Sequence, residues 1–218
     1  MIYELELTKA NRILLASAFH DVPRVDCSIP CVIEGQMGRA FVDDPAGPTI
    51  FHLVIGPFHY FAGPAVSPQA QAMMANFPPY NLLMPSTAGW AELARQQFGE
   101  ALRTNVRHSF SSEALSAGHL QQLLAASTCP AQVAAIDEAL AAQLSSGPDA
   151  YLGLADFDSP ADFAARGVGY VALVEDRPVG IAYSSLVYSQ GIEVSIYVAE
   201  AYRRQGIATA LAANLLLA

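Results

Sequence analysis

A cationic segment containing a glycine has the composition of an anion site. It reads Arg203-Arg204-Gln205-Gly206-Ile207-Ala208 and follows a run rich in β-branched and aromatic residues, 192–198. From Gln205 onward, apolar residues recur at helical spacing. A strand that enters a helix through such a turn leaves backbone N–H groups unpaired at the helix start, where the helix dipole adds positive charge. Because Gly206 and Ala208 are small, a ligand can approach the backbone closely. The sequence therefore predicts a site for a phosphate or pyrophosphate.

The pattern Arg203-x-x-Gly206-x-Ala208, after a strand that ends in Val-Ala-x-x-Tyr-Arg, resembles the acetyl-CoA signature of the GNAT acetyltransferase superfamily. In that family the amides of the turn hold the pyrophosphate of coenzyme A, and the preceding strand pairs with the pantetheine arm. The alternative is an ordinary strand–helix connection with a glycine near the cap. The resemblance implies acetyl-CoA as the cofactor, bound by Tyr197, Val198, Arg203, Arg204, Gln205, Gly206, Ile207, Ala208 and Thr209.

The resemblance also implies direct transfer of an acetyl group to an amine of a small molecule. A base is needed because an alkylammonium has no lone pair at pH 7. In several members of the family the base is a glutamate on the strand before the signature, which points to Glu193 here; the alternative is a solvated charge on the sheet. A backbone N–H near Tyr197 or Val198 is the expected oxyanion donor. The alternative function is a non-catalytic acyl-CoA-binding or structural module.

The order of elements in the second half positions these residues. Strands are expected at 132–136, 170–174, 179–188 and 192–198, with helices at 137–144 and from Ser159-Pro160 to Gly167. On the last strand, Glu193, Ser195 and Tyr197 share one face. The predicted last helix buries Ile207, Leu211, Leu215 and Leu216, and further pocket candidates are Tyr183, Tyr188 and Tyr202. This order matches the GNAT core, so the resemblance covers 132–218.

The first half shows a similar order without the cationic turn. A helix is expected at 8–19, packing Ala10, Ile13, Leu14 and Ala18, and strands at 31–34, 39–42, 49–55, 59–62 and 80–85. A helix then starts at Ser86-Thr87, with Trp90 in its core-facing stripe. The stretch 103–116, including Arg107, is expected to join the halves, and 145–158 to form a loop.

We therefore predict an α+β (mixed α/β) fold with a mainly antiparallel central sheet flanked by helices. An N-terminal α/β domain, 1–125, resembles a degenerate GNAT-like half, as in two-part members related to antibiotic self-resistance acetyltransferases, and 126–218 is the acetyl-CoA-binding domain. In the family further elements follow the cofactor-binding helix and carry a tyrosine that protonates the departing thiolate. Because this chain stops inside that helix, we expect a truncated sequence; the alternative is that a partner or the N-terminal half supplies the missing wall of the cleft. The open edge of the sheet favours association, for example as a homodimer.

Composition excludes several other classes of function. The 218 residues carry a net charge of −9 and 53% of them are hydrophobic, which argues for a globular protein that binds no nucleic acid. No apolar run reaches the roughly 20 residues that span a bilayer, and Glu4 and Glu6 stand where a signal peptide would be basic, so we expect a cytoplasmic protein. Cys27, Cys31 and Cys129 and the five histidines have no metal-ligand spacing; His52 and His59 are expected to be core or edge histidines.

Overall fold

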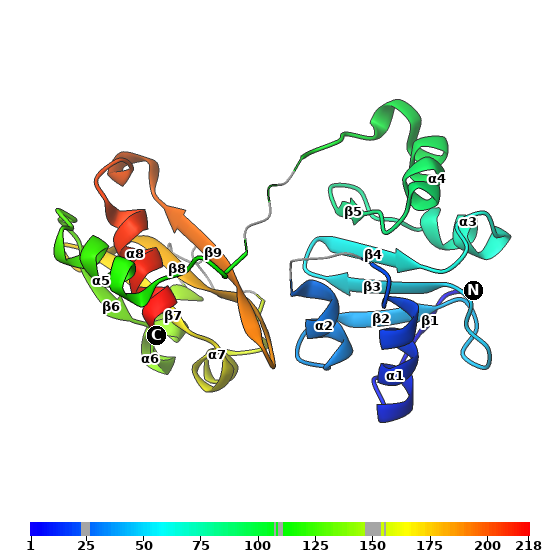
Figure 1. Cartoon of the computed structure of the whole chain (residues 1–218), viewed down its shortest axis with the longest axis horizontal. Coiled ribbons are helices and arrows are strands. Elements are labelled where there is room, and N and C mark those ends of the chain that lie inside the picture. Colours follow the sequence, from blue (N-terminus) through cyan, green and yellow to red (C-terminus); the bar gives the residue numbers. More distant parts are fainter. Residues whose placement is uncertain (23–26, 107, 109–110, 147–153, 155) are drawn as a thin grey trace. The chain divides into compact units, whose positions relative to one another are not determined.

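The structure is a computed structural model that describes residues 1–22, 27–106, 108, 111–146, 154 and 156–218. It contains two compact units, Met1–Phe110 with Tyr188–Gln190, and Ser111–Val187 with Gly191–Ala218 (Figure 1). The predicted linker 103–116 and loop 145–158 include residues outside the described part, Arg107 among them. These units divide the chain near 110/111, whereas the sequence predicted domains of 1–125 and 126–218. The resemblance of the first half to a degenerate GNAT domain stays a prediction.

The first unit is built on a five-stranded sheet in the order β1-β2-β3-β4-β5. The first four strands pair antiparallel, and β5 pairs parallel with β4. The strands are β1 Tyr3–Glu4, β2 Arg39–Val42, β3 Phe51–Ile55, β4 Phe58–Ala62 and β5 Leu82–Met84. The helices are α1 Lys9–Ala18, α2 Ser28–Ile33, α3 Pro68–Met74, α4 Ala88–Phe98 and the 3₁₀ turn η1 Gly99–Ala101.

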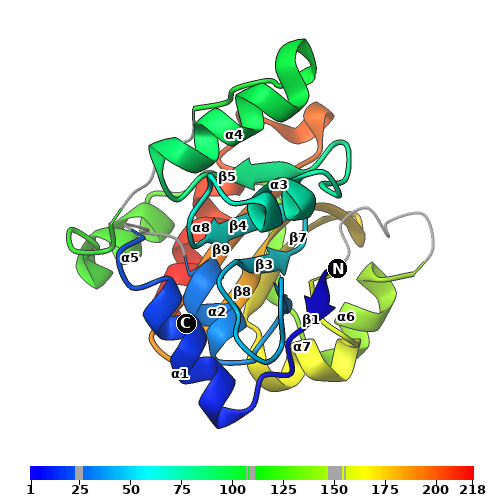
Figure 2. The ribbon, with the colours of Figure 1, turned by 90° about the vertical axis from the view of Figure 1, so that its right-hand side faces the viewer.

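Trp90 lies in the core of this unit, as the sequence predicted. Its ring is fully buried and stacks on Phe61 with 4.9 Å between centroids. Its indole Nε1–H donates to the Gly63 carbonyl at 3.1 Å, so the one polar atom of the ring is satisfied. Helices α3 and α4, which carry much of this core, contact each other directly (Figure 2).

Two helices of the first unit were not predicted from the sequence. The predicted strand 31–34 is part of helix α2, in which Ser28, Ile29, Cys31 and Val32 are buried at the spacing of a helical face. Helix α3 was not predicted, although Ser67 caps it and Pro68 opens it.

Helix α1 exists as predicted, but it presents the other side to the core. Leu15 within the helix and Phe19 at its C-cap are buried, whereas Ile13 is 65% exposed and Leu14 38% exposed. Four apolar residues in a short helix fit more than one stripe, so the sequence alone did not decide which face is buried.

The second unit has a four-stranded sheet in the order β6-β7-β8-β9, formed by consecutive strands. β7 pairs antiparallel with both β6 and β8, with an irregularity at Ala172/Leu173, and β8 and β9 are joined by a two-residue turn. The strands are β6 Gln132–Ala135, β7 Gly169–Val174, β8 Arg177–Tyr188 and β9 Gly191–Val198. The helices are α5 Ala117–Ala125, α6 Glu138–Leu144, α7 Pro160–Arg166, the 3₁₀ turn η3 Glu200–Tyr202 and α8 Ile207–Leu217. The predicted fold class, mixed α/β with mainly antiparallel sheet, is confirmed.

Helix α8 packs on one face of this sheet and against α5 (Figure 1). Ile207, Leu211 and Leu215 are buried in a cluster with residues of β7, β8 and β9. Leu216, which the sequence placed on the same side, is 37% exposed, because one position along a helix turns the side chain by about 100°. Helix α5, whose residues fall within the predicted N-terminal domain 1–125, packs against α8 in the second unit.

Candidate functional site

The start of helix α8 differs from that of most other helices in the chain. Its N-cap, Gly206, has φ +80° and ψ −2°, and it offers no side chain to the first turn. In six other helices the N-cap side chain accepts a hydrogen bond from a backbone N–H: Thr8, Ser67, Thr87, Ser116, Asp137 and Ser159. Among the α-helices of the described residues, only the six-residue α2 shares the lack of a side-chain cap.

The open first turn of α8 leaves donors that a ligand can use. The N–H of Ala210 bonds to the Gly206 carbonyl at 3.0 Å, which is the first bond of the helical ladder. The N–H groups of Ile207, Ala208 and Thr209 precede it, and within the described residues none of them bonds to a backbone carbonyl one turn earlier. A Cβ built at Gly206 would meet nothing closer than 3.9 Å, so space is open beside the turn. The geometry suits a phosphate group.

The two arginines of the turn have different surroundings. The Nε–H of Arg203 donates to the Val198 carbonyl at 2.9 Å, so this guanidinium ties the turn to the end of β9. Arg204 is exposed with φ +64°, and within the described residues its guanidinium has no hydrogen-bond or ion-pair partner. Gln205 is also exposed and donates to the Ala201 carbonyl at 3.3 Å. Arg204 is therefore the cation that is available to an anion at this turn.

Strand β9 separates an apolar face from a polar one. Val194 and Val198 pack into the cluster beneath α8. Because side chains alternate along a strand, Glu193, Ser195 and Tyr197 lie on the opposite face. Glu193 and Ser195 are half-buried, and Tyr197 is exposed. Tyr202, one of the pocket candidates, packs against the apolar cluster instead.

A polar group on this second face joins Tyr183 to Asp156, a residue that the sequence did not single out. The Tyr183 hydroxyl donates to Oδ2 of Asp156 at 3.3 Å, and it also shares a hydrogen bond with the Ser195 side chain. Although Asp156 is exposed by surface area, desolvation by the protein atoms around its carboxylate raises its pKa, and the bond from Tyr183 opposes that shift in part. Burial and the charge of Asp156 raise the pKa of Tyr183. Asp156 comes from a predicted loop, where no periodic pattern could have indicated it.

The first unit holds a buried histidine pair, as expected of core histidines. Nε2 of His52 lies 2.8 Å from Nδ1 of His59, whose Nε2 lies 3.2 Å from Oδ1 of Asn81. Burial, with the charge of His59 as a smaller cause, lowers the pKa of His52 to about 3. In the described part of the chain no three His, Cys, Asp or Glu residues are grouped as metal ligands would be.

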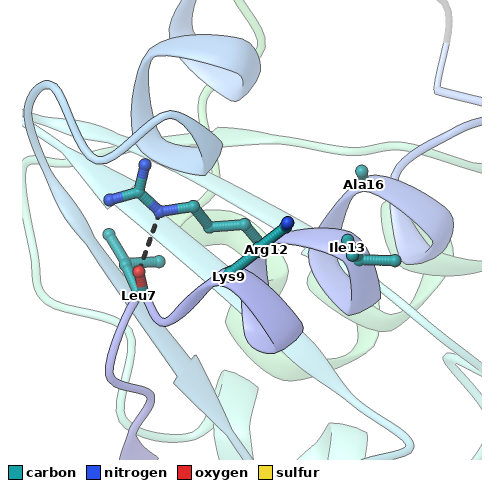
Figure 3. Close-up of a pocket in the computed structure, with 5 residues that line it drawn as sticks. All are labelled: Leu7, Lys9, Arg12, Ile13 and Ala16. Carbon is teal, nitrogen blue, oxygen red and sulfur yellow. Dashed lines mark hydrogen bonds between the residues drawn. The ribbon is translucent and has the colours of Figure 1, made fainter.

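A surface hollow of about 370 Å³ also belongs to the first unit (Figure 3). Its lining residues come from α1 and the segment before it: Leu7, Lys9, Arg12, Ile13 and Ala16. The Arg12 guanidinium already donates to the carbonyls of Leu7 and Glu34, at 2.8 and 2.6 Å. None of the predicted site residues lines this hollow, and the guanidinium of Arg12 is already used in hydrogen bonds that stabilise the fold.

Comparison with known proteins gives a consistent result. The family model described as GNAT acetyltransferase matches residues 23–218. The structure is similar to the crystal structure of a GCN5-related N-acetyltransferase-like protein from Streptococcus suis, with a TM-score of 0.80 and 26% sequence identity over 96% of this chain and 84% of that one. No curated protein matches this chain. Among the described residues, no helix has the length and apolar character that crossing a membrane requires.

Proposed function

Because this chain belongs to the GNAT acetyltransferase family, we propose that it transfers an acetyl group from acetyl-CoA to an amine of a small molecule. The observation that carries the proposal is the start of α8, which is open, glycine-capped and cationic. Such a helix start binds anionic groups through its free N–H donors and its dipole.

The residues of the turn fit the diphosphate of coenzyme A. The N–H groups of Ile207, Ala208 and Thr209 would hold phosphate oxygens, and Arg204 would add a full positive charge. Gly206 leaves the approach open. The backbone of Tyr197 and Val198 would face the pantetheine arm. Arg203, through its bond to the Val198 carbonyl, would keep the strand end and the turn in register for both contacts.

The chemistry requires the acceptor nitrogen to be neutral when it attacks. Bound acetyl-CoA supplies the acetyl group as a thioester. Glu193, on the polar face of β9, would accept a proton from the amine, directly or through a water. Attack would form the nitrogen–carbon bond and break the carbon–sulfur bond, with the electron pair leaving on sulfur, and the proton that the nitrogen loses as it becomes an amide would neutralise the thiolate directly or through solvent. A backbone N–H near Tyr197 or Val198 would stabilise the negative charge that develops on the carbonyl oxygen.

The cofactor site is tested by calorimetry with coenzyme A on wild type and Gly206→Asp. The carboxylate at position 206 fills the approach and repels the diphosphate, so we expect affinity to fall at least tenfold, which is about 1.4 kcal/mol. Gly99→Asp is the matched control, because Gly99 also has positive φ and open space beside it but lies at the end of α4. Equal binding by Gly206→Asp and wild type would contradict the site, as would a folded wild type that binds no coenzyme A.

The base is tested by thiol release from acetyl-CoA with a panel of amines. Loss of a general base costs roughly 10²- to 10⁴-fold in rate, so we expect Glu193→Gln to lower kcat by that order without weakening coenzyme A binding. Glu138→Gln, on the exposed side of α6, is the control and should behave as wild type. Unchanged turnover in Glu193→Gln would remove Glu193 from this role. Tight cofactor binding without turnover of any amine would favour a non-catalytic acyl-CoA-binding module.

A further inference from the structure

Gly180 lies in the interior of β8, where a glycine weakens the strand and often marks a close approach of another group. It is buried, and it is not one of the glycines with positive φ. Its backbone conformation is therefore open to any residue, so the torsion angles do not require a glycine here. The requirement comes from the space on the side of the strand where a side chain would stand.

Groups from β9 and α8 occupy that space. A Cβ at Gly180 would lie 3.0 Å from the Tyr197 carbonyl oxygen, and 3.2 Å from both Leu211 Cδ1 and Val198 Cγ2. Leu211 and Val198 are buried in a packed core, so neither side chain can easily turn away. The carbonyl belongs to the backbone of β9 and can move only with the strand. A methyl group at position 180 would therefore push the end of β9 away from β8.

The end of β9 is also fixed by two hydrogen bonds. The Ala199 N–H donates to the carbonyl of Val179, the neighbour of Gly180 on β8, at 2.9 Å. The Arg203 Nε–H donates to the Val198 carbonyl at 2.9 Å and ties the strand to the turn before α8. Gly180 thus lies where β8, β9 and α8 meet, and the path of β9 past this glycine sets the position of the strand end relative to the first turn of α8.

We propose that Gly180 is a positioning residue for acetyl transfer. Because position 180 has no side chain, β9 lies close enough to β8 for the backbone of Tyr197 and Val198 to meet the pantetheine arm and the thioester while the diphosphate lies on the α8 turn. This inference rests on the proposed function, because it concerns the same cofactor site. The effect of Gly180 passes through β9. Misplacement by about 1 Å can cost an enzyme roughly 10²-fold in rate, so a displaced strand end has a measurable consequence.

Gly169 provides a matched control in the same sheet. It is buried in β7, and a Cβ there would lie 3.0 Å from each of three side-chain atoms, in Ile136, Phe163 and Tyr183. These contacts are as tight as those at Gly180, but none of the three is with β9 or with a backbone atom. Gly169→Ala should therefore strain the core of the second unit without displacing the strand that meets the cofactor.

The test is calorimetric titration of coenzyme A and of ADP into wild type, Gly180→Ala and Gly169→Ala, with thermal unfolding measured on the same samples. ADP carries a diphosphate without the pantetheine arm, so the ratio of the two affinities reports on the contact between the arm and β9. We expect Gly180→Ala to bind ADP as wild type does and to lower this ratio by roughly fivefold or more. Gly169→Ala should keep the wild-type ratio even if it melts at a lower temperature. In assays of thiol release from acetyl-CoA, kcat should fall in Gly180→Ala and not in Gly169→Ala.

A double variant separates the position of β9 from crowding in the core. In Gly180→Ala/Leu211→Val the lost methylene group offsets the added methyl group, so the core keeps its volume while the Tyr197 carbonyl is still pushed. This variant should fold and show the same lowered ratio. A wild-type ratio in either variant that carries Gly180→Ala would overturn the inference, and so would an equal fall in Gly169→Ala or loss of ADP binding in a folded Gly180→Ala. A wild type that binds neither ligand would contradict the cofactor site itself, and the inference with it.

Discussion

His52 and His59 show how two ionisable residues can sit in a hydrophobic sheet without charge. The His52 ring stacks on Phe61 with 4.2 Å between centroids, and it shares its Nε2 with His59 through a hydrogen bond. In a neutral pair one ring nitrogen donates and the other accepts, so both inward-facing nitrogens are satisfied. Protonation would place a charge where burial disfavours it.

This arrangement predicts that the protein becomes less stable as the pH falls below about 6.5. The pKa of His52 is about 3 in the folded protein and 6.5 when unperturbed, so between these values the unfolded chain binds more protons than the folded one. The free energy of unfolding should fall by up to a few kcal/mol over this range. Urea unfolding at pH 7, 6, 5 and 4 measures it.

The matched variant for this prediction is His52→Gln. It cannot titrate in this range, and its amide can still hydrogen-bond to His59, so the fall in stability between pH 6.5 and 4 should be smaller. An identical pH dependence in wild type and His52→Gln would show that other groups are responsible.

At the scale of elements, helix α8 shows that residues with the same predicted orientation can differ in burial. Leu211 is fully buried, and its Cδ1 would lie 3.2 Å from a Cβ at Gly180, whereas Leu216 is 37% exposed. Leu211→Ala should therefore destabilise the second unit by about 2–5 kcal/mol, because it leaves a cavity, and Leu216→Ala by less than about 1 kcal/mol. Thermal unfolding followed by far-UV circular dichroism distinguishes the two. Similar losses in both variants would mean that the exposed and buried sides of α8 are wrongly placed.

Elements with local signals were predicted well from the sequence. Thr8, Thr87, Asp137 and Ser159 mark helix starts that the structure confirms, because a capping side chain acts within three residues of its own position. Segment 31–34 was misjudged because a short run of β-branched residues is compatible with either a strand or a buried helix. In the structure this segment forms part of helix α2, which packs against β3.

In the candidate site, too, the features that are local in sequence could be predicted and the tertiary contacts could not. The turn Arg203–Ala208 is continuous in sequence, so its glycine, its cations and the helix after it could be recognised together. Asp156 reaches Tyr183 across 27 positions of chain, and Arg203 turns its side chain back to Val198. Both contacts depend on tertiary structure, and no spacing in the sequence encodes them.

At the scale of the whole molecule, the chain consists of two units that each have a core of their own. The sequence predicted two parts and included residues 117–125 in the first, whereas helix α5 packs against α8 in the second unit. The pattern of an amphipathic helix between two domains does not indicate which core the helix will join. The net charge of −9 gives the molecule a field that attracts cations and repels anions. A cationic acceptor would gain from this field, whereas coenzyme A would depend on the local charge of the α8 turn.

The single tryptophan gives the molecule a spectroscopic asymmetry. Trp90 is buried in the first unit against Phe61, and the second unit has tyrosines but no tryptophan. Intrinsic tryptophan emission therefore reports the loosening of one core and leaves the other optically silent. A tryptophan placed at the exposed position Leu216 would give the second unit its own fluorophore, so that the melting of each core could be recorded separately in one intact chain.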